Sequence, residues 1–135
     1  MRIGIFDSGL GGLFLMKPVI EKLPQYEYVY LGDTKNLPYG DKSQEEVYRF
    51  TKLALDYLFA HDCTIVFLFC NTASSMALRR LQHEGYRALG IIIPTVEKLC
   101  DIECRTVGVL GTQSTVDSGK YIVEIKKLLI DCFKW

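Results

Sequence analysis

The stretch 64–69 (TIVFLF), followed directly by Cys70-Asn71-Thr72, decides the fold that this 135-residue sequence predicts. Its residues are apolar or β-branched and show no polar alternation. Such a run predicts a strand that is buried on both faces, as in a parallel sheet. A helix is predicted to follow over about 73–83. A strand that leads almost directly into a helix is typical of α/β proteins.

Four further strands are expected around this one, mostly with a helix between successive strands. They are predicted at 3–6, 26–31, 89–93, where Pro94 ends the strand, and 106–110, and the last helix at about 118–129. The expected fold class is therefore α/β: a parallel sheet with helices on both faces, in alternating strand–helix order.

Local signals place two of the helices. Ser43 and Glu46 form an S-x-x-E capping box, which predicts a helix that begins there and ends near His61. The buried face of that helix is expected to carry Val47, Phe50, Ala54, Tyr57 and Leu58, which recur at helical spacing. Pro18 lies inside the earlier helical stretch that ends near Leu23, so we expect a kink or a late helix start there.

The composition argues for an ordinary folded domain and against several classes of partner. The chain has 16 basic and 16 acidic residues and a net charge of zero, so bulk charge attracts neither nucleic acid nor an anionic membrane. The longest apolar run near a possible signal position, 13–16, is too short for a membrane span or a signal peptide. We expect a cytoplasmic protein without a nucleic-acid or membrane partner.

The cysteines indicate neither a disulfide framework nor a metal site. The chain has five of them, an odd number, and no secretory signal. No C-x-x-C pair of the kind that holds structural zinc occurs, so no metal is expected. Free cysteines in a reducing compartment are most often small buried packing residues, and a role for any of them must be argued against that alternative.

Polar residues follow four of the predicted strands, where open α/β sheets carry their sites. They are Asp7-Ser8, Asp33-Thr34, Cys70-Asn71-Thr72 and Gly111-Thr112. Common nucleotide and phosphate motifs do not fit. The glycine-rich turn at 9–12 has Phe14 where a dinucleotide fingerprint needs glycine, and no P-loop sequence occurs. An aspartyl phosphatase needs a second aspartate at Gly9.

Cys70 is the candidate catalytic residue among these groups. It precedes a predicted helix, whose positive end favours the thiolate, and a thiolate can act as a base or a nucleophile. Asn71, Thr72 and the free N–H groups of the helix can hold a carboxylate. Asp7 can receive an ammonium group, or can simply cap the next helix. Together the groups suit a small zwitterion, which indicates amino-acid chemistry.

The same residues resemble the signature blocks of the glutamate racemase family, within the aspartate/glutamate racemase superfamily. The blocks are 5–12 (IFDSGLGG), 30–34 (YLGDT) with 37–40 (LPYG) and 42–43, 70–74 (CNTAS), and 108–112 (GVLGT) with Thr115 and 118–121 (SGKY). Their order and spacing agree over about residues 3–129. The opening block also differs from the glycine-rich turn usual in aspartate racemases.

The resemblance implies a racemase that interconverts L- and D-glutamate without a cofactor and so supplies D-glutamate for peptidoglycan, the cell wall and cell shape. In this family one cysteine thiolate removes the α-proton, and a second thiol returns a proton to the opposite face. Cys70 matches the first of these cysteines. The matching substrate contacts are Asp7, Ser8, Tyr39, Gly40, Asn71 and Thr72, with Thr112 and Thr115 as further positions.

The chain departs from the family in length and in its second cysteine. Family members are about twice as long and have two lobes, with the second cysteine in a G-C-T-H motif. None of Cys100, Cys104 and Cys132 has that context, and the tail 131–135 does not resemble the family's continuation. We expect residues 1–94 to form the first lobe, and 95–135 to form a hinge and the incomplete start of a second lobe. Exposed apolar surface is expected where the absent parts would pack.

These departures leave alternatives open. The chain is either a racemase by descent, with half an active site, or a truncated inactive fragment or amino-acid-binding module without the second cysteine. A racemase for aspartate or another amino acid is a third reading, which the opening motif disfavours. The expected partners are glutamate and either a second copy of the chain or the missing second lobe.

Overall fold

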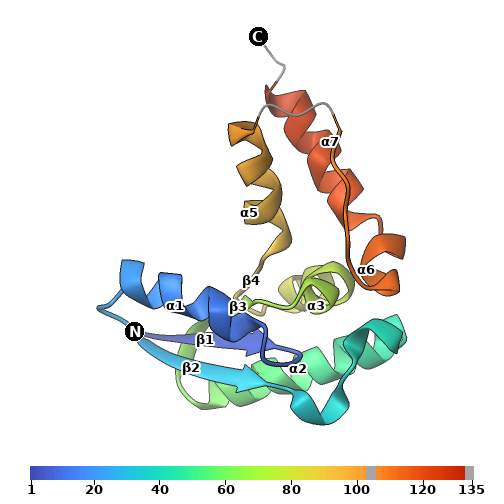
Figure 1. Cartoon of the computed structure of the whole chain (residues 1–135). Coiled ribbons are helices and arrows are strands. Elements are labelled where there is room, and N and C mark those ends of the chain that lie inside the picture. The colour runs from blue at the N-terminus through green and yellow to red at the C-terminus, as the bar shows by residue number, and fades with distance from the viewer. Residues whose placement is uncertain (103–105, 133–135) are drawn as a thin grey trace.

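A four-stranded parallel sheet forms the centre of the computed structural model, which describes residues 1–102 and 106–132. The strands are β1 (Arg2–Asp7), β2 (Glu27–Gly32), β3 (Cys63–Leu68) and β4 (Ala88–Gly90), in the order β2-β1-β3-β4. Every neighbouring pair is parallel. The predicted α/β fold class is confirmed, and the parallel arrangement brings the carboxyl ends of the strands to one edge (Figure 1).

Helices connect the strands and lie on both faces of the sheet (Figure 1). Helix α1 (Gly12–Lys22) follows β1, and α2 (Gln44–Ala60) follows β2 after the short 3₁₀ turns η1 (Thr34–Asn36) and η2 (Tyr39–Asp41). Helices α3 (Asn71–Met76) and α4 (Leu78–His83) join β3 to β4, with Ala77 between them. The capping box predicted for α2 is present, because Ser43 Oγ accepts from Glu46 N and Glu46 Oε2 accepts from Ser43 N.

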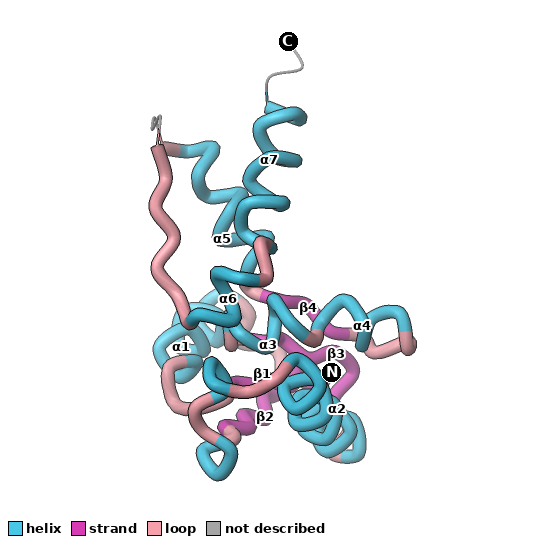
Figure 2. Tube along the Cα trace, turned by 90° about the vertical axis from the view of Figure 1, so that its right-hand side faces the viewer, coloured by secondary structure: helices cyan, strands magenta, loops and turns pink. Residues whose placement is uncertain are grey.

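The chain beyond β4 forms an arm that projects from the sheet. It consists of α5 (Ile92–Glu97), η3 (Lys98–Asp101), α6 (Gln113–Asp117) and α7 (Lys120–Cys132). Figure 2 shows α5 and α7 rising together and the loop before α6 returning toward the sheet. Within residues 1–102 and 106–132, no helix is both long and apolar enough to cross a membrane.

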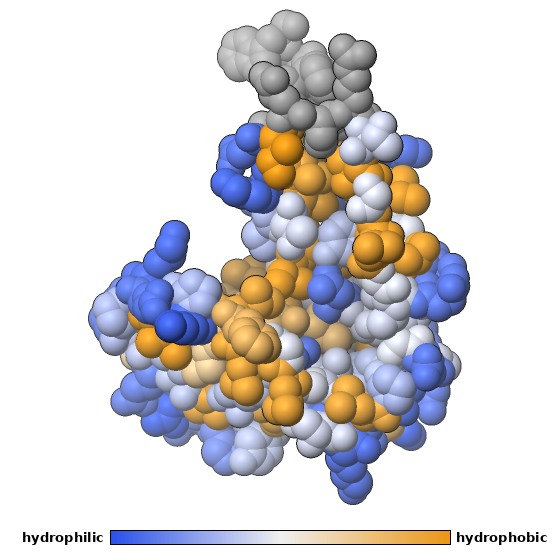
Figure 3. Space-filling model, in the orientation of Figure 1, coloured by the Kyte–Doolittle hydropathy of each residue, from blue (hydrophilic) through white to orange (hydrophobic). Residues whose placement is uncertain are grey.

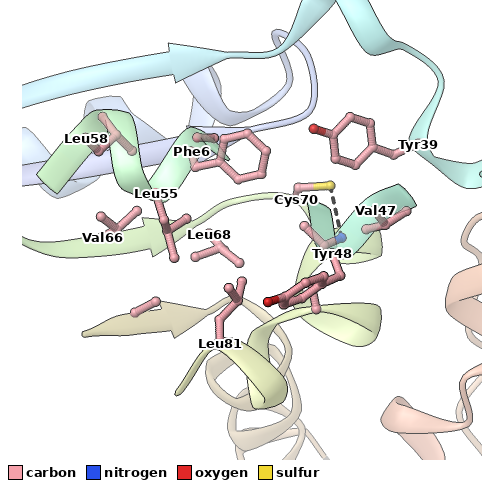
Figure 4. Close-up of a cluster of buried hydrophobic side chains, with 14 of the residues drawn as sticks. Phe6, Tyr39, Val47, Tyr48, Leu55, Leu58, Val66, Leu68, Cys70 and Leu81 are labelled. Carbon is pink, nitrogen blue, oxygen red and sulfur yellow. Dashed lines mark hydrogen bonds between the residues drawn. The ribbon is translucent and has the colours of Figure 1, made fainter. Parts of the chain in front are cut away.

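The main hydrophobic core lies between the sheet and α2. Phe6, Val66 and Leu68 point to this side and pack with Leu55 and Leu58 of α2 (Figure 4). All five side chains are fully buried. The predicted apolar face of α2 is right for most positions, but Tyr57 is 51% exposed and Leu55 takes the buried place instead.

The opposite face of the sheet is only partly covered. Ile3 and Ile5 are buried on that side, but their neighbour Phe67 on β3 is half-buried and Leu89 on β4 is 52% exposed. The prediction that the whole 64–69 run is buried on both faces is therefore wrong for the outer part of the sheet. Helix α1 covers this face near β1, and no described element covers it at β4 (Figure 1).

Two predicted strands differ from the structure. Residues 91–93 do not continue β4, because α5 begins at Ile92 and Pro94 is its third residue. A proline is tolerated in the first helical turn, where its missing N–H has no intrahelical partner to lose. Residues 106–110 form no strand within the described part of the chain, since none of the four strands pairs with them. An extended apolar run becomes a strand only when a partner accepts its hydrogen bonds.

The remaining differences concern helix boundaries. Helix α1 begins at Gly12 and contains Pro18, so the late start, one of the two alternatives expected at this proline, does not occur, and the kink stays a prediction. The helix predicted over 73–83 is divided at Ala77 into α3 and α4. The last predicted helix is preceded by the separate short helix α6.

Candidate functional site

The end of β1 places a buried carboxylate at the sheet edge. Asp7 Oδ2 accepts a hydrogen bond of 2.8 Å from Gly12 N, at the start of α1, and one of 3.4 Å from Tyr30 Oη. Asp7 can therefore both cap α1 and receive an ammonium group. Its Oδ2 accepts from the helix start, and its Oδ1 has no protein donor among the described residues. A side chain at position 12 would place its Cβ 3.0 Å from Asp7 Cβ, so this close approach requires glycine.

The thiol of Cys70 lies between a hydroxyl and a backbone amide. Cys70 is the N-cap residue of α3, and Ala73 N donates to its Sγ at 3.4 Å. Ser8 Oγ lies 3.1 Å from the same sulfur, with either atom able to donate. Figure 4 shows Cys70 at the margin of the main core, close to Tyr39. The N–H donor and the neighbouring hydroxyl both stabilise a negative charge on the sulfur.

Tyr39 and Gly40 lie on η2, beside this thiol. Tyr39 is buried, and its hydroxyl donates to Asp33 Oδ2 at 2.7 Å. Burial, aided by Asp33, raises the pKa of Tyr39 well above its usual range, so the hydroxyl stays protonated. Gly40 packs against Thr112, since a Cβ at position 40 would lie 2.6 Å from Thr112 Cγ2. Asp33 thus fixes Tyr39, and Gly40 permits contact with the arm.

Three threonine hydroxyls meet where α3 contacts α6. Thr72 Oγ1 lies 3.0 Å from Thr112 Oγ1 and 3.4 Å from Thr115 Oγ1, and the latter two are 2.9 Å apart. Thr72 and Thr115 are buried, whereas Thr112 is exposed. Because each hydroxyl both donates and accepts, the cluster joins α6 to the sheet edge, with Thr112 as its exposed member.

The structure therefore brings the predicted site residues to one edge of the sheet. Ser8 contacts Cys70, Gly40 contacts Thr112, and Thr72 contacts both Thr112 and Thr115. Asn71 follows Cys70 as the first residue of α3. Three further residues support these side chains through hydrogen bonds, and their sequence context gave them no separate role. They are Tyr30, Asp33 and Tyr121.

Tyr30 and Tyr121 support predicted residues through their hydroxyls. Tyr30 Oη donates to Gly9 O at 3.0 Å as well as to Asp7, and burial, with Asp7 adding to the effect, raises the pKa of Tyr30 to about 12. Tyr121 Oη donates to Asn71 Oδ1 at 2.5 Å. No short-range sequence signal identifies these partners, because the members of each pair are 23 and 50 positions apart.

The other thiol whose side chain is described does not belong to this site. Cys63 begins β3, at the opposite end of that strand from Cys70, and burial raises the pKa of its thiol. Cys63 is therefore a packing residue. Cys100, Cys104 and Cys132 lie outside the described side chains. Among the described residues, no cluster of three His, Cys, Asp or Glu side chains is placed to hold a metal ion. The arrangement suits proton transfer by one thiol, on one face of a bound molecule.

Comparison with known proteins gives one consistent result. The chain is 40% identical over 129 residues to the glutamate racemase of Aquifex aeolicus, a match that covers 94% of this chain and 51% of that protein. It is also 38% identical to the glutamate racemase of Lactobacillus johnsonii, covering 92% of this chain and 47% of the relative. The chain thus spans about half the length of the curated relatives it matches. No protein-family profile matches it.

Solved structures agree with these relatives. Glutamate racemase from Aquifex pyrophilus superposes with a TM-score of 0.89 at 37% identity, over 94% of this chain and 51% of that one. The Francisella tularensis glutamate racemase, solved in complex with D-glutamate, superposes with a TM-score of 0.83 at 31% identity, over 93% of this chain and 48% of that one. The expected resemblance to one half of this family is confirmed.

Proposed function

Because the chain is homologous over nearly its whole length to about half of glutamate racemase, we propose that it provides the first-cysteine half of a cofactor-independent glutamate racemase. The observation that carries the proposal is the setting of Cys70. Its sulfur has a backbone N–H donor and the Ser8 hydroxyl beside it, at the sheet edge where Asp7 and the threonine hydroxyls also lie.

The chemistry follows from these neighbours. The Cys70 thiolate removes the α-proton of glutamate, and the Ala73 N–H and the Ser8 hydroxyl stabilise the thiolate before transfer. Oδ1 of Asp7 receives the substrate ammonium. Asn71, Thr72 and Thr112, with Thr115 behind them, supply donors to a carboxylate, and Tyr39 and Gly40 close the opposite wall. D-glutamate made in this way serves peptidoglycan synthesis in the cytoplasm.

Inversion needs a second acid on the other face of the α-carbon. Cys70 serves one face, and Cys63 is too far along β3 to serve the other. We propose that residues 1–94 form the first lobe, that 95–135 form a hinge and the start of a second, and that the second acid belongs to the remaining half of the family fold. That half would be an added lobe; in the alternative of a homodimer, the second acid would instead be Cys70 of a second copy of this chain.

An exposed apolar face is where such a partner would pack. Phe14 on α1 is 84% exposed, and Leu89 and Ile93 are exposed at the foot of α5. Figure 3 shows apolar surface around the angle between α1 and α5. A surface of this kind on a folded chain is typical of a protein–protein contact. A dye that fluoresces on apolar surfaces is expected to fluoresce with the folded chain. No increase in fluorescence would contradict the proposal that this face is an exposed partner surface.

The test of the proposed function is exchange of the α-proton of L-glutamate in D₂O, followed by NMR. Exchange by the chain that is lost in Cys70→Ser and kept in Cys63→Ser supports Cys70 as the base. Chirality of the product then shows whether a second face is served. Folded chain that exchanges no α-proton, with or without glutamate binding, would favour the alternative of an inactive fragment or amino-acid-binding module.

A further inference from the structure

A tyrosine on the arm contacts the residue beside the candidate base. Tyr121 lies in the first turn of α7, and its hydroxyl donates to Asn71 Oδ1 at 2.5 Å. Asn71 is the first residue of α3 and follows Cys70 directly. This bond therefore links the arm to the segment that carries the thiol, across 50 positions of sequence.

The turn between α6 and α7 determines this approach. Gly119 has a φ of +63°, in the left-handed region that favours glycine, and it reverses the chain between the two helices. Ser118 Oγ accepts from Lys120 N at 3.3 Å and donates to Thr115 O at 2.6 Å. The start of α7 is thereby held against α6, which the threonine cluster in turn holds against α3.

The bond has a chemical consequence for the Asn71 amide. An asparagine side chain offers one carbonyl oxygen and one NH₂ group with two donors. Tyr121 occupies the oxygen, and no acceptor for Nδ2 occurs among the residues that the structure describes. Burial raises the pKa of Tyr121, although Thr95 acts in the opposite sense, so its hydroxyl stays a donor at neutral pH. The exposed amide is therefore oriented with its donors available to a ligand.

We propose that Tyr121 is a positioning residue, which holds the Asn71 amide so that its NH₂ group donates to a carboxylate of the bound amino acid. The inference rests on the proposed function, because it explains how the proposed glutamate site would favour a carboxylate, a group that only accepts hydrogen bonds. Without the Tyr121 hydroxyl, the amide is free to rotate and to present its oxygen, which repels a carboxylate.

A double-mutant cycle tests this coupling. The affinity for L-glutamate is measured by NMR titration of the full chain, for wild type, Tyr121→Phe, Asn71→Ala and the double variant. Tyr121→Phe keeps the ring and is expected to weaken binding about 2- to 12-fold, the effect of one ordinary hydrogen bond. In the Asn71→Ala background the same change is expected to have no effect.

Tyr28→Phe is the matched control, because the Tyr28 hydroxyl donates to Leu23 O away from the site. Its affinity for glutamate should equal that of wild type. Urea unfolding of each variant confirms that all are folded at the titration temperature. A Tyr121→Phe effect that persists in the Asn71→Ala background, or no effect in either background, would overturn the inference while glutamate binding by wild type stands. Absence of binding by folded wild type would instead overturn the proposed function, and the inference with it.

Discussion

Replacing Gly40 by alanine tests the contact between the sheet edge and the arm. A Cβ at this position would lie 2.6 Å from Thr112 Cγ2 and 2.7 Å from Thr112 Cβ. Thr112 is the N-cap residue of α6, and its Cβ is bonded directly to the backbone. A rotation of the side chain can move Cγ2 but not Cβ, so it cannot relieve both contacts. The substitution must therefore push α6 away from η2.

The size of the effect follows from these distances. Reaching an ordinary contact distance of 3.4 Å requires Thr112 to move by about 0.8 Å. A shift of this size directed away from Thr72 would lengthen the 3.0 Å separation of the Thr72 and Thr112 hydroxyls beyond hydrogen-bonding range. Overpacking of this kind costs about 1–3 kcal/mol of the free energy of unfolding. Loss of one hydroxyl donor to the substrate weakens glutamate binding by about 5-fold.

Urea unfolding followed by circular dichroism measures the stability change, and NMR titration measures glutamate affinity. With an ordinary urea dependence, the midpoint of Gly40→Ala should fall by about 1 M. Gly108→Ala is the matched control, because its Cβ would meet no atom within 4 Å and its φ is not positive. Equal midpoints for the two variants would refute the reasoning. Thr112→Ser removes the nearer atom, so adding it to Gly40→Ala should recover part of the stability.

Three further substitutions test the supports of the site. Tyr39→Phe removes the 2.7 Å hydrogen bond to Asp33 and should lower the free energy of unfolding by about 1–3 kcal/mol, measured by urea denaturation. Ser43→Ala removes the capping box shared with Glu46 and should cost about 1 kcal/mol in the same assay. The pKa of Tyr30 is raised to about 12, so its contribution to stability is complete below pH 10 and is lost as the pH rises through 12. Tyr30→Phe should therefore lose less stability than wild type between pH 10 and 12.

Each of these outcomes has its own control. Tyr28→Phe removes a tyrosine hydroxyl away from the site and should change stability less than Tyr39→Phe. Equal losses of unfolding free energy in the two variants would show that the hydrogen bond from Tyr39 to Asp33 adds no particular stability. Unchanged helix content and midpoint in Ser43→Ala would contradict the role of the cap. An alkaline stability curve for Tyr30→Phe that parallels wild type would contradict the assignment of the raised pKa to Tyr30.

Local sequence determined much of the fold and the centre of the site. The apolar and β-branched residues before Cys70 predict a strand from their own composition, and Ser43 and Glu46 start α2 through hydrogen bonds within one turn. Cys70, Asn71 and Thr72 are adjacent in sequence, so their place at the sheet edge follows from the strand that precedes them. The family resemblance could be read from short blocks for the same reason.

Tertiary structure alone decided what depends on distant neighbours. The sheet face that carries Phe67 and Leu89 is partly open because α1 covers it only near β1. The residues of β3 and β4 do not themselves encode where α1 packs. Pro94 lies in the first turn of α5 rather than ending a strand, since the first helical turn tolerates proline. The bond from Tyr121 to Asn71 depends on how the chain returns to the sheet after α6. Short-range patterns specify backbone conformation and chemistry, whereas these partners exist only once packing has brought remote segments together.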